Sequence, residues 1–494
     1  MLLIGLSGCL KTQIKETDVD VSLTKDSDPV KEALALVPGV SNVQISTSAD
    51  GQKAYFFCFN QALDHSNPAA GTFPQRVSLR YAGEDKPVVL NTQGYSMGDD
   101  ADGLEPVHLA QALGASIVEV EHRYFGKSNP EDPALLAYQY LYTEQAAEDL
   151  HAIVQMFKGS LFKTNKWIAT GLSKSGITAA LQAYYSDKKG WKDIDVFVPF
   201  GAPFLTELFD RRMGDFLWEK AGSNYPAGSV EAAAYERLRR FPAAISGREE
   251  LRKTCIQMFQ LSYNEEAQML VREFGADEKV LTCGVLRAYF ELLSLKWSYL
   301  PFTYWAPMVP DPETDDVTQI LSFIFMDVQG MLRSLRAGDQ TKSGYRDNKI
   351  IYHLDKSTQL VYYIQGCREL GLHTFNYAGV DGSYITADYA ASVARSLDFA
   401  SRYGRYASQW DGGALMSAVR AWVKTQSAEE IIFVYGTNDP WSCGAVEMDA
   451  DANPHVSYIW NTGGGHYNYI LYPLFFQEAA SVAVVNAVKA VLGR

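Results

Sequence analysis

Three polar side chains in this 494-residue sequence have the types and the chain order that nucleophilic catalysis requires. Ser173 lies in the stretch Gly171-Leu-Ser-Lys-Ser-Gly176, and Asp439 and His466 each follow an apolar, strand-like run. A serine hydroxyl is a weak nucleophile at neutral pH and needs a base within hydrogen-bond reach. His466 is the predicted base, and Asp439 is predicted to fix the tautomer of its imidazole.

The stretch around Ser173 is typical of a nucleophile elbow, a tight turn between a strand and a helix. An apolar run precedes the turn, and a helix-like run follows it. Gly171 and Gly176 allow the strand and the helix to approach each other closely. The usual elbow reads Gly-x-Ser-x-Gly, and here Ser175 stands at the second glycine position.

Each of these residues taken singly also has an ordinary structural explanation. A Gly-x-Ser stretch can be a chance turn, Asp-Pro commonly starts a turn, and a histidine after glycines can lie on the surface. In α/β-hydrolases the serine, the acid and the histidine occur in this chain order, each after a strand. The combination therefore favours a catalytic triad of Ser173, Asp439 and His466.

The oxyanion of an acyl-transfer intermediate requires two preorganised donors. One is predicted to be the backbone N–H of Lys174, the residue after the nucleophile. The other is expected in the loop after the strand at 87–92, and we assign it to the N–H of Tyr95, with Gly94 and Ser96 as rivals. The side chain of Lys174 is expected on the surface or in a supporting position rather than as the catalytic base.

Alternating strand-like and helix-like segments must position these groups, and such alternation indicates a mostly parallel sheet. The first two strands are expected to be antiparallel. Strands are expected at 55–59, 76–81, 87–92, 116–120, 167–170, 195–200, 430–435 and 456–460, and helices at 105–113, after an N-cap at Thr143, and at 478–492.

The segment from 206 to 425 is helical in pattern and interrupts the alternation between the nucleophile and the acid. A hydrolase cap belongs at that place in the chain. The predicted fold class is α/β, with an α/β-hydrolase core of residues 41–205 and 426–494. The helical cap is predicted over 206–425, and residues 1–40 are predicted to form a signal remnant and flexible tether.

Further motifs follow one another along the chain. They are Leu63-Asp-His-Ser-Asn-Pro68, Thr72–Arg76, Glu121–Gly126, Glu144–Asp149, Lys166–Lys174, Arg368–Gly371, Tyr435–Trp441 and Gly464–His466. Together they resemble the S37 serine peptidases, the PS-10 tripeptidyl-aminopeptidase family, from about residue 50 to 490. The Pro-X carboxypeptidases of family S28 are more distantly similar.

This resemblance implies an α/β-hydrolase core, a helical cap and exopeptidase activity. The family's triad carries over to Ser173, Asp439 and His466. One departure concerns the elbow, because S37 members usually read Ser-Lys-Gly-Gly and Ser175 replaces the first glycine here. An altered rate or specificity is the expected consequence of the added hydroxyl.

The composition limits the partners of this chain. A net charge of −14 and a pI of about 5.1 argue against nucleic acid and anionic membrane surfaces, and favour cationic ligands such as a free amine. An aminopeptidase needs a carboxylate for the α-ammonium group of its substrate, and Asp99 and Asp100 are candidates. Trp297 and Trp305, in an aromatic cluster of the cap, are candidates for the cleft wall. Each of these four side chains has an alternative as a solvated loop residue or as cap core.

Two residues after the strand at 116–120, His122 and Arg123, are interpreted as buried hydrogen-bonding residues near the site. The six cysteines show no paired metal-ligand spacing, so neither a metal nor another cofactor is expected. Cys255 and Cys283 are expected either to pair or to stay as buried thiols.

The N-terminal residues Leu6-Ser-Gly-Cys9 resemble a bacterial lipobox, with Cys9 as the lipidated residue. This predicts a lipoprotein of the bacterial cell envelope, periplasmic or at the surface, in contact with the membrane only through its lipid. The favoured function is a serine exopeptidase that releases short peptides from free N-termini. A Pro-X carboxypeptidase, an ester or lipid hydrolase, and a catalytically weak peptide-binding lipoprotein are the alternatives, and the oligomeric state is left open.

Overall fold

The computed structural model describes residues 28–104, 107–130, 138–300, 302–326, 358–380, 384–398, 404–425, 427–446, 453–466 and 478–493, with residues 382 and 401. Cys9 lies outside the described residues, so its lipidation stays a prediction. The described residues include a helix before the expected core boundary at residue 41. Asp28 accepts hydrogen bonds from the amides of Val30 and Lys31, and the helix that it caps buries Leu34 completely.

A nine-stranded sheet forms the core, in the order β1-β2-β3-β5-β4-β6-β7-β10-β11. The strands β1, β2 and β3 are antiparallel to their neighbours in the sheet. The strands β5, β4, β6, β7, β10 and β11, in that order across the sheet, run parallel to one another. The strands are β1 Val40–Thr47, β2 Lys53–Ala62, β3 Thr72–Arg80, β4 Val88–Asn91, β5 Ser116–Val120, β6 Trp167–Leu172, β7 Val196–Phe200, β10 Ile431–Gly436 and β11 Val456–Asn461.

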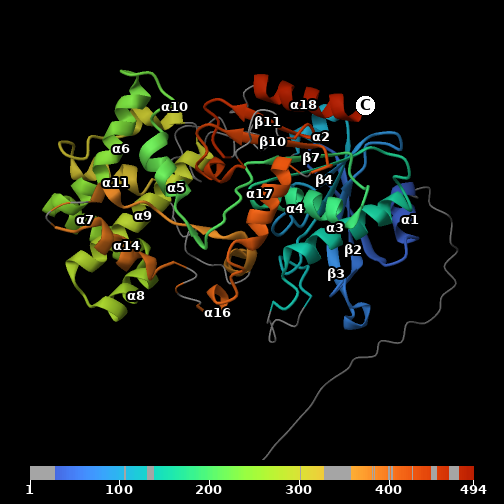
Figure 1. Ribbon diagram of the computed structural model, residues 1–494, viewed down its shortest axis with the longest axis horizontal. Coiled ribbons are helices and arrows are strands. Elements are labelled where there is room, and N and C mark those ends of the chain that lie inside the picture. Colours follow the sequence, from blue (N-terminus) through green and yellow to red (C-terminus); the bar gives the residue numbers. More distant parts are fainter. Residues whose placement is uncertain are drawn as a thin grey trace, which may run out of the picture.

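Helices cover both faces of this sheet, which confirms the predicted α/β-hydrolase architecture (Figure 1). One face packs against α1 Pro29–Ala35, α3 Thr143–Lys158, α4 Lys174–Lys189 and α17 Ala414–Thr425. The other face packs against α2 His108–Leu113 and α18 Glu478–Leu492.

Two local predictions need correction. The edge strand β1 had no counterpart among the expected strands, because its burial repeats as one half-buried residue in three rather than alternating. Thr143 is the first residue of α3 and not its N-cap. The backbone N–H of Thr143 instead donates to Glu369 Oε2 at 2.8 Å, so a carboxylate from the distant insertion satisfies the helix N-terminus.

The insertion forms a separate helical lobe, seen on the left in Figure 1. Its own apolar core is built mainly from residues 216–326 and 377–397. The lobe contains α5 Arg212–Asp215, η2 Phe216–Lys220, α6 Val230–Gly247, α7 Glu249–Ser262, α8 Asn264–Phe274, α9 Glu278–Tyr299, α10 Phe302–Trp305, η3 Ala306–Met308, α11 Val317–Ile324, η6 Ala378–Val380 and α14 Ala387–Arg395.

The rest of the insertion packs on the catalytic core. Met416 and Trp422 of α17 belong to the apolar cluster under the sheet, and Ile364 packs with Phe125. The predicted cap range 206–425 therefore includes segments that are part of the core. These are α13 Thr358–Gln365, η5 Gly366–Leu370, α16 Gly404–Ala407 and α17. A separate two-stranded parallel sheet pairs β8 Phe209–Asp210 with β9 Leu372–His373. Two further short turns are η1 Pro68–Ala70 and η7 Pro440–Gly444.

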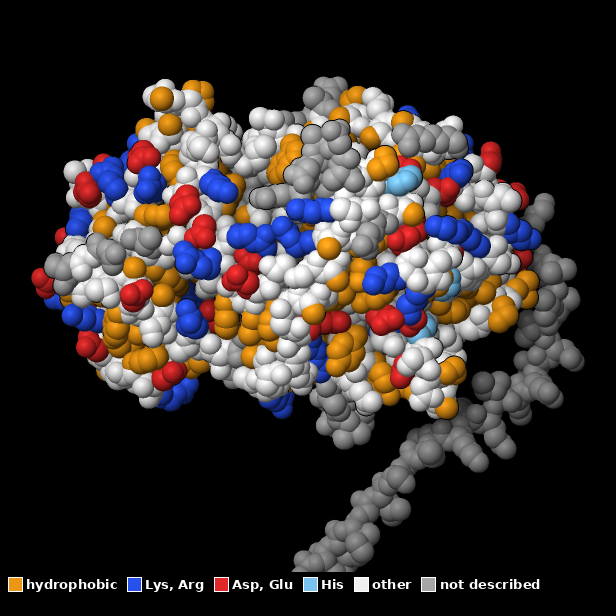
Figure 2. Space-filling model, in the orientation of Figure 1, with side chains coloured by type: hydrophobic (Ala, Val, Ile, Leu, Met, Phe, Trp, Pro, Cys, Tyr) orange, Lys and Arg blue, Asp and Glu red, His pale blue; other side chains and the backbone are white. Residues whose placement is uncertain are grey.

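Charged side chains of both signs are interspersed over the face in Figure 2, so the net negative charge does not gather in one patch there. Among the described residues, none of the helices combines the length and the apolar character that crossing a bilayer requires. All five described cysteines are free, so Cys255 and Cys283 are buried thiols and the disulfide alternative is not realised.

The cap buries a lysine whose charge is costly. Lys296 on α9 is 2% exposed and donates to the carbonyl of Ile324 at 3.2 Å. Burial lowers the pKa of Lys296 to about 7. Between pH 7 and 10.5, the ordinary pKa of a lysine, the unfolded chain therefore binds a proton that the folded chain does not, and the free energy of unfolding rises with pH across that window.

We expect Lys296→Met to raise the free energy of unfolding at pH 7 by about 1–3 kcal/mol, because the near-isosteric side chain needs no desolvation of a charge. The rise in stability between pH 7 and 9.5 should become shallower in the variant. Urea unfolding at both pH values measures this. Lys253→Met, at an exposed ion pair with Glu249, is the control and should change stability by a few tenths of a kcal/mol. Destabilisation by Lys296→Met would contradict the prediction.

Candidate active site

Ser173 occupies the tight turn between β6 and α4. Its backbone has φ 61° and ψ −122°, a conformation that residues with a Cβ rarely adopt. The two glycines of the turn are required by contact. A Cβ on Gly171 would lie 2.6 Å from the Cβ of Ser175, and one on Gly176 would lie 2.6 Å from the carbonyl oxygen of Phe200. The structure therefore contains the strand–turn–helix geometry that the motif predicted.

The other two predicted residues are hydrogen-bonded to each other. His466 Nδ1 lies 2.9 Å from Asp439 Oδ2, and Asp439 is completely buried. The same carboxylate accepts the hydroxyl of Ser442 at 2.9 Å and the backbone N–H of Trp441 at 2.9 Å. These donors fix the orientation of the carboxylate toward the imidazole. The ends of β10 and β11, which are adjacent parallel strands, bring the two residues together.

Gly201 joins this pair to the elbow. The backbone N–H of Ser173 donates to the carbonyl of Phe200 at 2.9 Å, and Gly201 follows with φ 52°. A Cβ on Gly201 would lie 3.0 Å from His466 Nδ1 and 3.3 Å from Asp439 Oδ2. The imidazole and the carboxylate thus lie against Gly201. Gly201 directly follows Phe200, whose carbonyl accepts the backbone N–H of Ser173. The three predicted residues follow the carboxyl ends of β6, β10 and β11, at the same edge of the sheet.

Two aromatic side chains that the sequence did not single out flank the histidine. Trp441 stacks on the ring of His466 with centroids 4.9 Å apart, and His373 lies 5.4 Å from Trp441. Burial, with smaller contributions from Arg287 and His466, lowers the pKa of His373 to about 4. His373 is therefore neutral at pH 7. No local motif marks it, because it reaches the site through the insertion.

The loop after β4 lies directly on the elbow. The backbone N–H of Gly94 donates to Ser175 Oγ at 2.7 Å, and Thr92 Oγ1 donates to the carbonyl of Ser175 at 2.7 Å. The Gly94 N–H is therefore already used, which removes it as a rival for the second oxyanion donor. The contact also explains how Ser175 is accommodated, since its hydroxyl faces the loop and has a partner there.

The side chain of Lys174 is buried beneath the same loop. It is 2% exposed, so the surface alternative for this side chain is wrong and the supporting one holds. Its ammonium group donates to the carbonyl of Gly94 and lies 4.9 Å and 5.5 Å from the ring centroids of Phe125 and Tyr95. Burial lowers the pKa of Lys174 well below its ordinary value.

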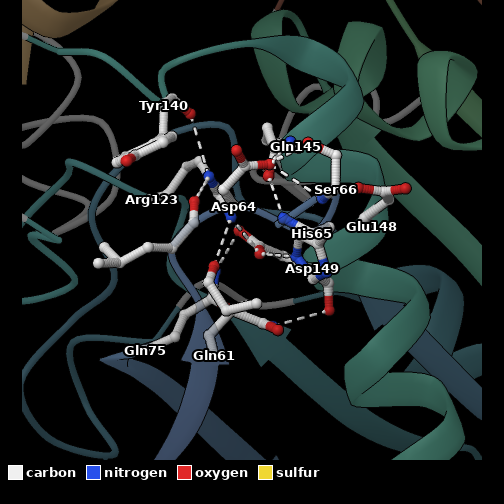
Figure 3. Close-up of polar contacts among 12 residues, drawn as sticks. Gln61, Asp64, His65, Ser66, Gln75, Arg123, Tyr140, Gln145, Glu148 and Asp149 are labelled. Atoms are coloured by element: carbon white, nitrogen blue, oxygen red, sulfur yellow. Dashed lines mark hydrogen bonds and ion pairs between the residues drawn. The ribbon is translucent and has the colours of Figure 1, made fainter. Parts of the chain in front are cut away.

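The interpretation of His122 and Arg123 as buried hydrogen-bonding residues is confirmed. Arg123 is completely buried and binds Asp149 through Nε at 2.7 Å and Nη2 at 2.6 Å. His65 Nε2 lies 2.8 Å from the same carboxylate (Figure 3). Gln75 Nε2 donates to the carbonyl of Glu121 at 3.0 Å. Four of the motifs quoted above thus meet in one network, which fixes the segment that leads to His122.

The four candidate substrate-binding residues lie in less favourable places. Asp99 forms ion pairs with Lys127 at 2.6 Å and Arg76 at 3.0 Å, so two cations already neutralise it. Asp100 Oδ1 closes a turn by accepting the N–H of Gly103 at 2.8 Å.

The two tryptophans belong to the apolar core of the cap. Trp297 is 1% and Trp305 0% exposed, and their rings meet edge to face at 5.3 Å. The structure therefore corrects their assignment to a cleft wall, because they fill the cap interior.

The cap carries its own charged cluster, which the sequence did not reveal. Arg287 forms ion pairs with Asp398 at 3.2 Å and with Glu291 at 3.9 Å. Burial raises the pKa of Glu291 to about 8.

Comparison with known proteins agrees with the motifs. Residues 24–224 match the model of the family described as PS-10 peptidase S37. Prolyl tri/tetrapeptidyl aminopeptidase from Streptomyces mobaraensis is 25% identical over 463 residues, which cover 93% of this chain and 84% of that protein. Serine protease vicPb from Bipolaris victoriae is 32% identical over 100 residues, or 18% of this chain and 19% of that protein.

Among solved structures, a proline iminopeptidase from Mycobacterium smegmatis aligns with a TM-score of 0.36 and 12% identity, covering 92% of this chain and 99% of that chain. That likeness is too distant to bear on activity. The ordered motifs, the family match and the nearly full-length relative agree with one another. The chain is accordingly similar to the S37 serine peptidases, and the match to the family model covers residues 24–224.

Proposed function

We propose that this peptidase is an exopeptidase that releases short peptides, tripeptides in the first instance, from free N-termini through a Ser-Asp-His triad and an acyl-enzyme. Ser173 Oγ attacks the scissile carbonyl while His466 accepts its proton. The imidazolium then protonates the leaving amine. Water attacks the resulting ester with His466 as base, which returns Ser173 and releases the peptide acid.

The observation that carries this proposal is the Asp439–His466 hydrogen bond of 2.9 Å beside Gly201, with Ser173 on the adjoining elbow. The buried carboxylate holds the imidazole tautomer and stabilises the imidazolium. The backbone N–H groups of Lys174 and Tyr95 are the proposed donors to the oxyanion. A peptide-binding protein without catalysis would have no use for this arrangement.

Removal of peptides from the N-terminus is supported by the relative that covers most of this chain, which is named as a tri/tetrapeptidyl aminopeptidase. The net charge of −14 also favours a substrate with a free ammonium group over one with a free carboxylate. We propose localisation to the cell envelope only on the ground of the lipobox-like residues before Cys9.

We expect a tripeptidyl p-nitroanilide with a free amine to be cleaved with a kcat/KM at least about 100-fold above that of its N-acetylated twin. Acetylation removes the charge of the α-ammonium group, and the loss of a charge-assisted contact costs a few kcal/mol. Release of p-nitroaniline gives both rates, and mass spectrometry of a longer peptide identifies the fragment released.

Equal rates on the two substrates would favour an endopeptidase or an esterase. Release of single residues from the C-terminal end would favour the Pro-X carboxypeptidase. Ser173→Ala protein from the same preparation is the control for contaminating peptidases, because it should cleave neither substrate.

A further inference from the structure

The backbone of Gly94 is held from both sides by the two residues that follow the nucleophile. Ser175 Oγ accepts the N–H of Gly94 at 2.7 Å, and the ammonium group of Lys174 donates to its carbonyl. The fit is close, since a Cβ on Gly94 would lie 2.7 Å from the backbone nitrogen of Ser175. Gly94 therefore rests directly on the first turn of α4.

The carbonyl of Gly94 and the N–H of Tyr95 belong to the same peptide unit. That unit is planar and trans, so the two groups point in opposite directions. Lys174 draws the carbonyl toward the interior behind the elbow, next to Phe125 and His122. The N–H of Tyr95 consequently points away from the interior. The hydrogen bond from Lys174 therefore helps to set the direction of the Tyr95 N–H, together with the conformation of the loop.

The next carbonyl along the loop is fixed as well. Tyr95 O accepts the backbone N–H of His122 at 3.1 Å, and His122 follows the segment that the Arg123–Asp149 network holds. The Gly94–Tyr95 segment is thus fixed by hydrogen bonds at three backbone groups, the N–H and carbonyl of Gly94 and the carbonyl of Tyr95. Such a loop cannot turn its N–H without breaking a buried hydrogen bond.

We infer that Lys174 is a positioning residue for the oxyanion hole, its side chain aiming and polarising the Gly94–Tyr95 peptide whose N–H stabilises the tetrahedral intermediate. The inference rests on the proposed function. A donor bound to the carbonyl strengthens the opposite N–H as a donor, because hydrogen bonds in a chain polarise one another. Ser175 assists by holding the other side of Gly94.

The surroundings of the ammonium group support an electrostatic role. Besides the Gly94 carbonyl it faces two aromatic rings, and the cavity beside it, lined by Ile177, Leu181 and other side chains, has a volume of about 10 Å³. That volume holds at most one water. The hydrogen bond from the Lys174 amine to the Gly94 carbonyl is therefore shielded from water, and it polarises the peptide more than it would on the surface.

The test compares Lys174→Met with wild type on the free tripeptidyl p-nitroanilide. We expect kcat to fall about 10- to 100-fold with KM nearly unchanged, since only the intermediate carries the oxyanion. A peptidyl aldehyde, whose adduct with Ser173 places an oxygen in the same hole, should bind more weakly by the same factor as kcat/KM falls. The affinity of the tripeptide product should stay within about twofold.

Lys296→Met is the matched control, because it also removes a buried lysine that donates to a backbone carbonyl, but in the cap. It should change the unfolding free energy and leave kcat and aldehyde affinity unchanged. If Lys174→Met does not fold, Ser175→Ala tests the same peptide, with an expected loss of about 3- to 10-fold in kcat and in aldehyde affinity. Ser186→Ala, a buried serine of the same helix, should show neither loss.

The outcomes separate this inference from the proposed function. Full turnover by Ser173→Ala would overturn the proposed function. An inactive Ser173→Ala together with folded Lys174→Met of unchanged kcat and aldehyde affinity would overturn only the role of Lys174. A fall in product affinity as large as the fall in aldehyde affinity would also contradict it, because a general loss of structure would then explain both.

Discussion

Replacing Ser173 with alanine is expected to lower kcat by roughly 10³- to 10⁶-fold, the range for loss of a triad nucleophile. The variant has no hydroxyl to form the acyl-enzyme, so only the oxyanion donors and substrate binding still contribute. A fluorophosphonate should label wild type at Ser173 and leave the variant unlabelled. Turnover measured on the tripeptidyl p-nitroanilide gives the size of the loss.

The fold of this variant should be intact. Alanine keeps the Cβ, so the strain of the backbone at φ 61° is the same in both proteins. Thermal unfolding should therefore coincide with that of wild type. Ser186→Ala is the control for labelling, since this buried serine lies on the same helix outside the site. Undiminished turnover in Ser173→Ala would end the hydrolase mechanism as proposed.

Replacing Asp439 with asparagine should lower kcat by about 10⁴-fold at neutral pH. The carboxylate accepts from His466 Nδ1 at 2.9 Å and from the hydroxyl of Ser442 at 2.9 Å. An amide in this position either turns its nitrogen toward His466, which favours the wrong tautomer, or loses the charge that stabilises the imidazolium. Rate profiles over pH 6–9 measure the loss and show whether alkaline conditions restore part of it.

Asp193→Asn is the matched control, because Asp193 is also a buried aspartate bound to a histidine, His151, but away from the site. It should retain activity. His466→Ala should be as damaging as loss of the serine, whereas His455→Ala should be nearly neutral, since His455 is half-exposed and pairs with Glu430. A fully active Asp439→Asn, with activity lost on changing Asp449 or Asp451 instead, would show that the acid is misassigned.

The sequence predicted most strands of the core closely, and the last helix to the residue. Buried parallel strands are continuous apolar runs, and helix ends carry local signals such as Gly114, which has the expected left-handed φ of 60°. The N-cap of α3 was predicted wrongly because the group that satisfies this helix terminus is not local in the sequence. Glu369, which binds that helix terminus, is 226 residues away in the chain.

The order of Ser173, Asp439 and His466 and the glycines around the serine were readable because each belongs to a short stretch whose geometry is local. A strand, a turn and a helix start are encoded within a few residues. Sequence alone therefore determined the fold class, the resemblance to the S37 peptidases and the three residues that we propose for catalysis.

Only the tertiary structure decided which side chains support them. Ser442, Gly201 and Trp441 contact the Asp439–His466 pair, yet no spacing distinguishes them from ordinary loop residues. The same holds for the side chain of Lys174, for which the sequence left a surface and a supporting position open, and which is buried under Gly94. Burial and contact depend on segments far apart in the chain, and a one-dimensional pattern carries no record of which of them meet.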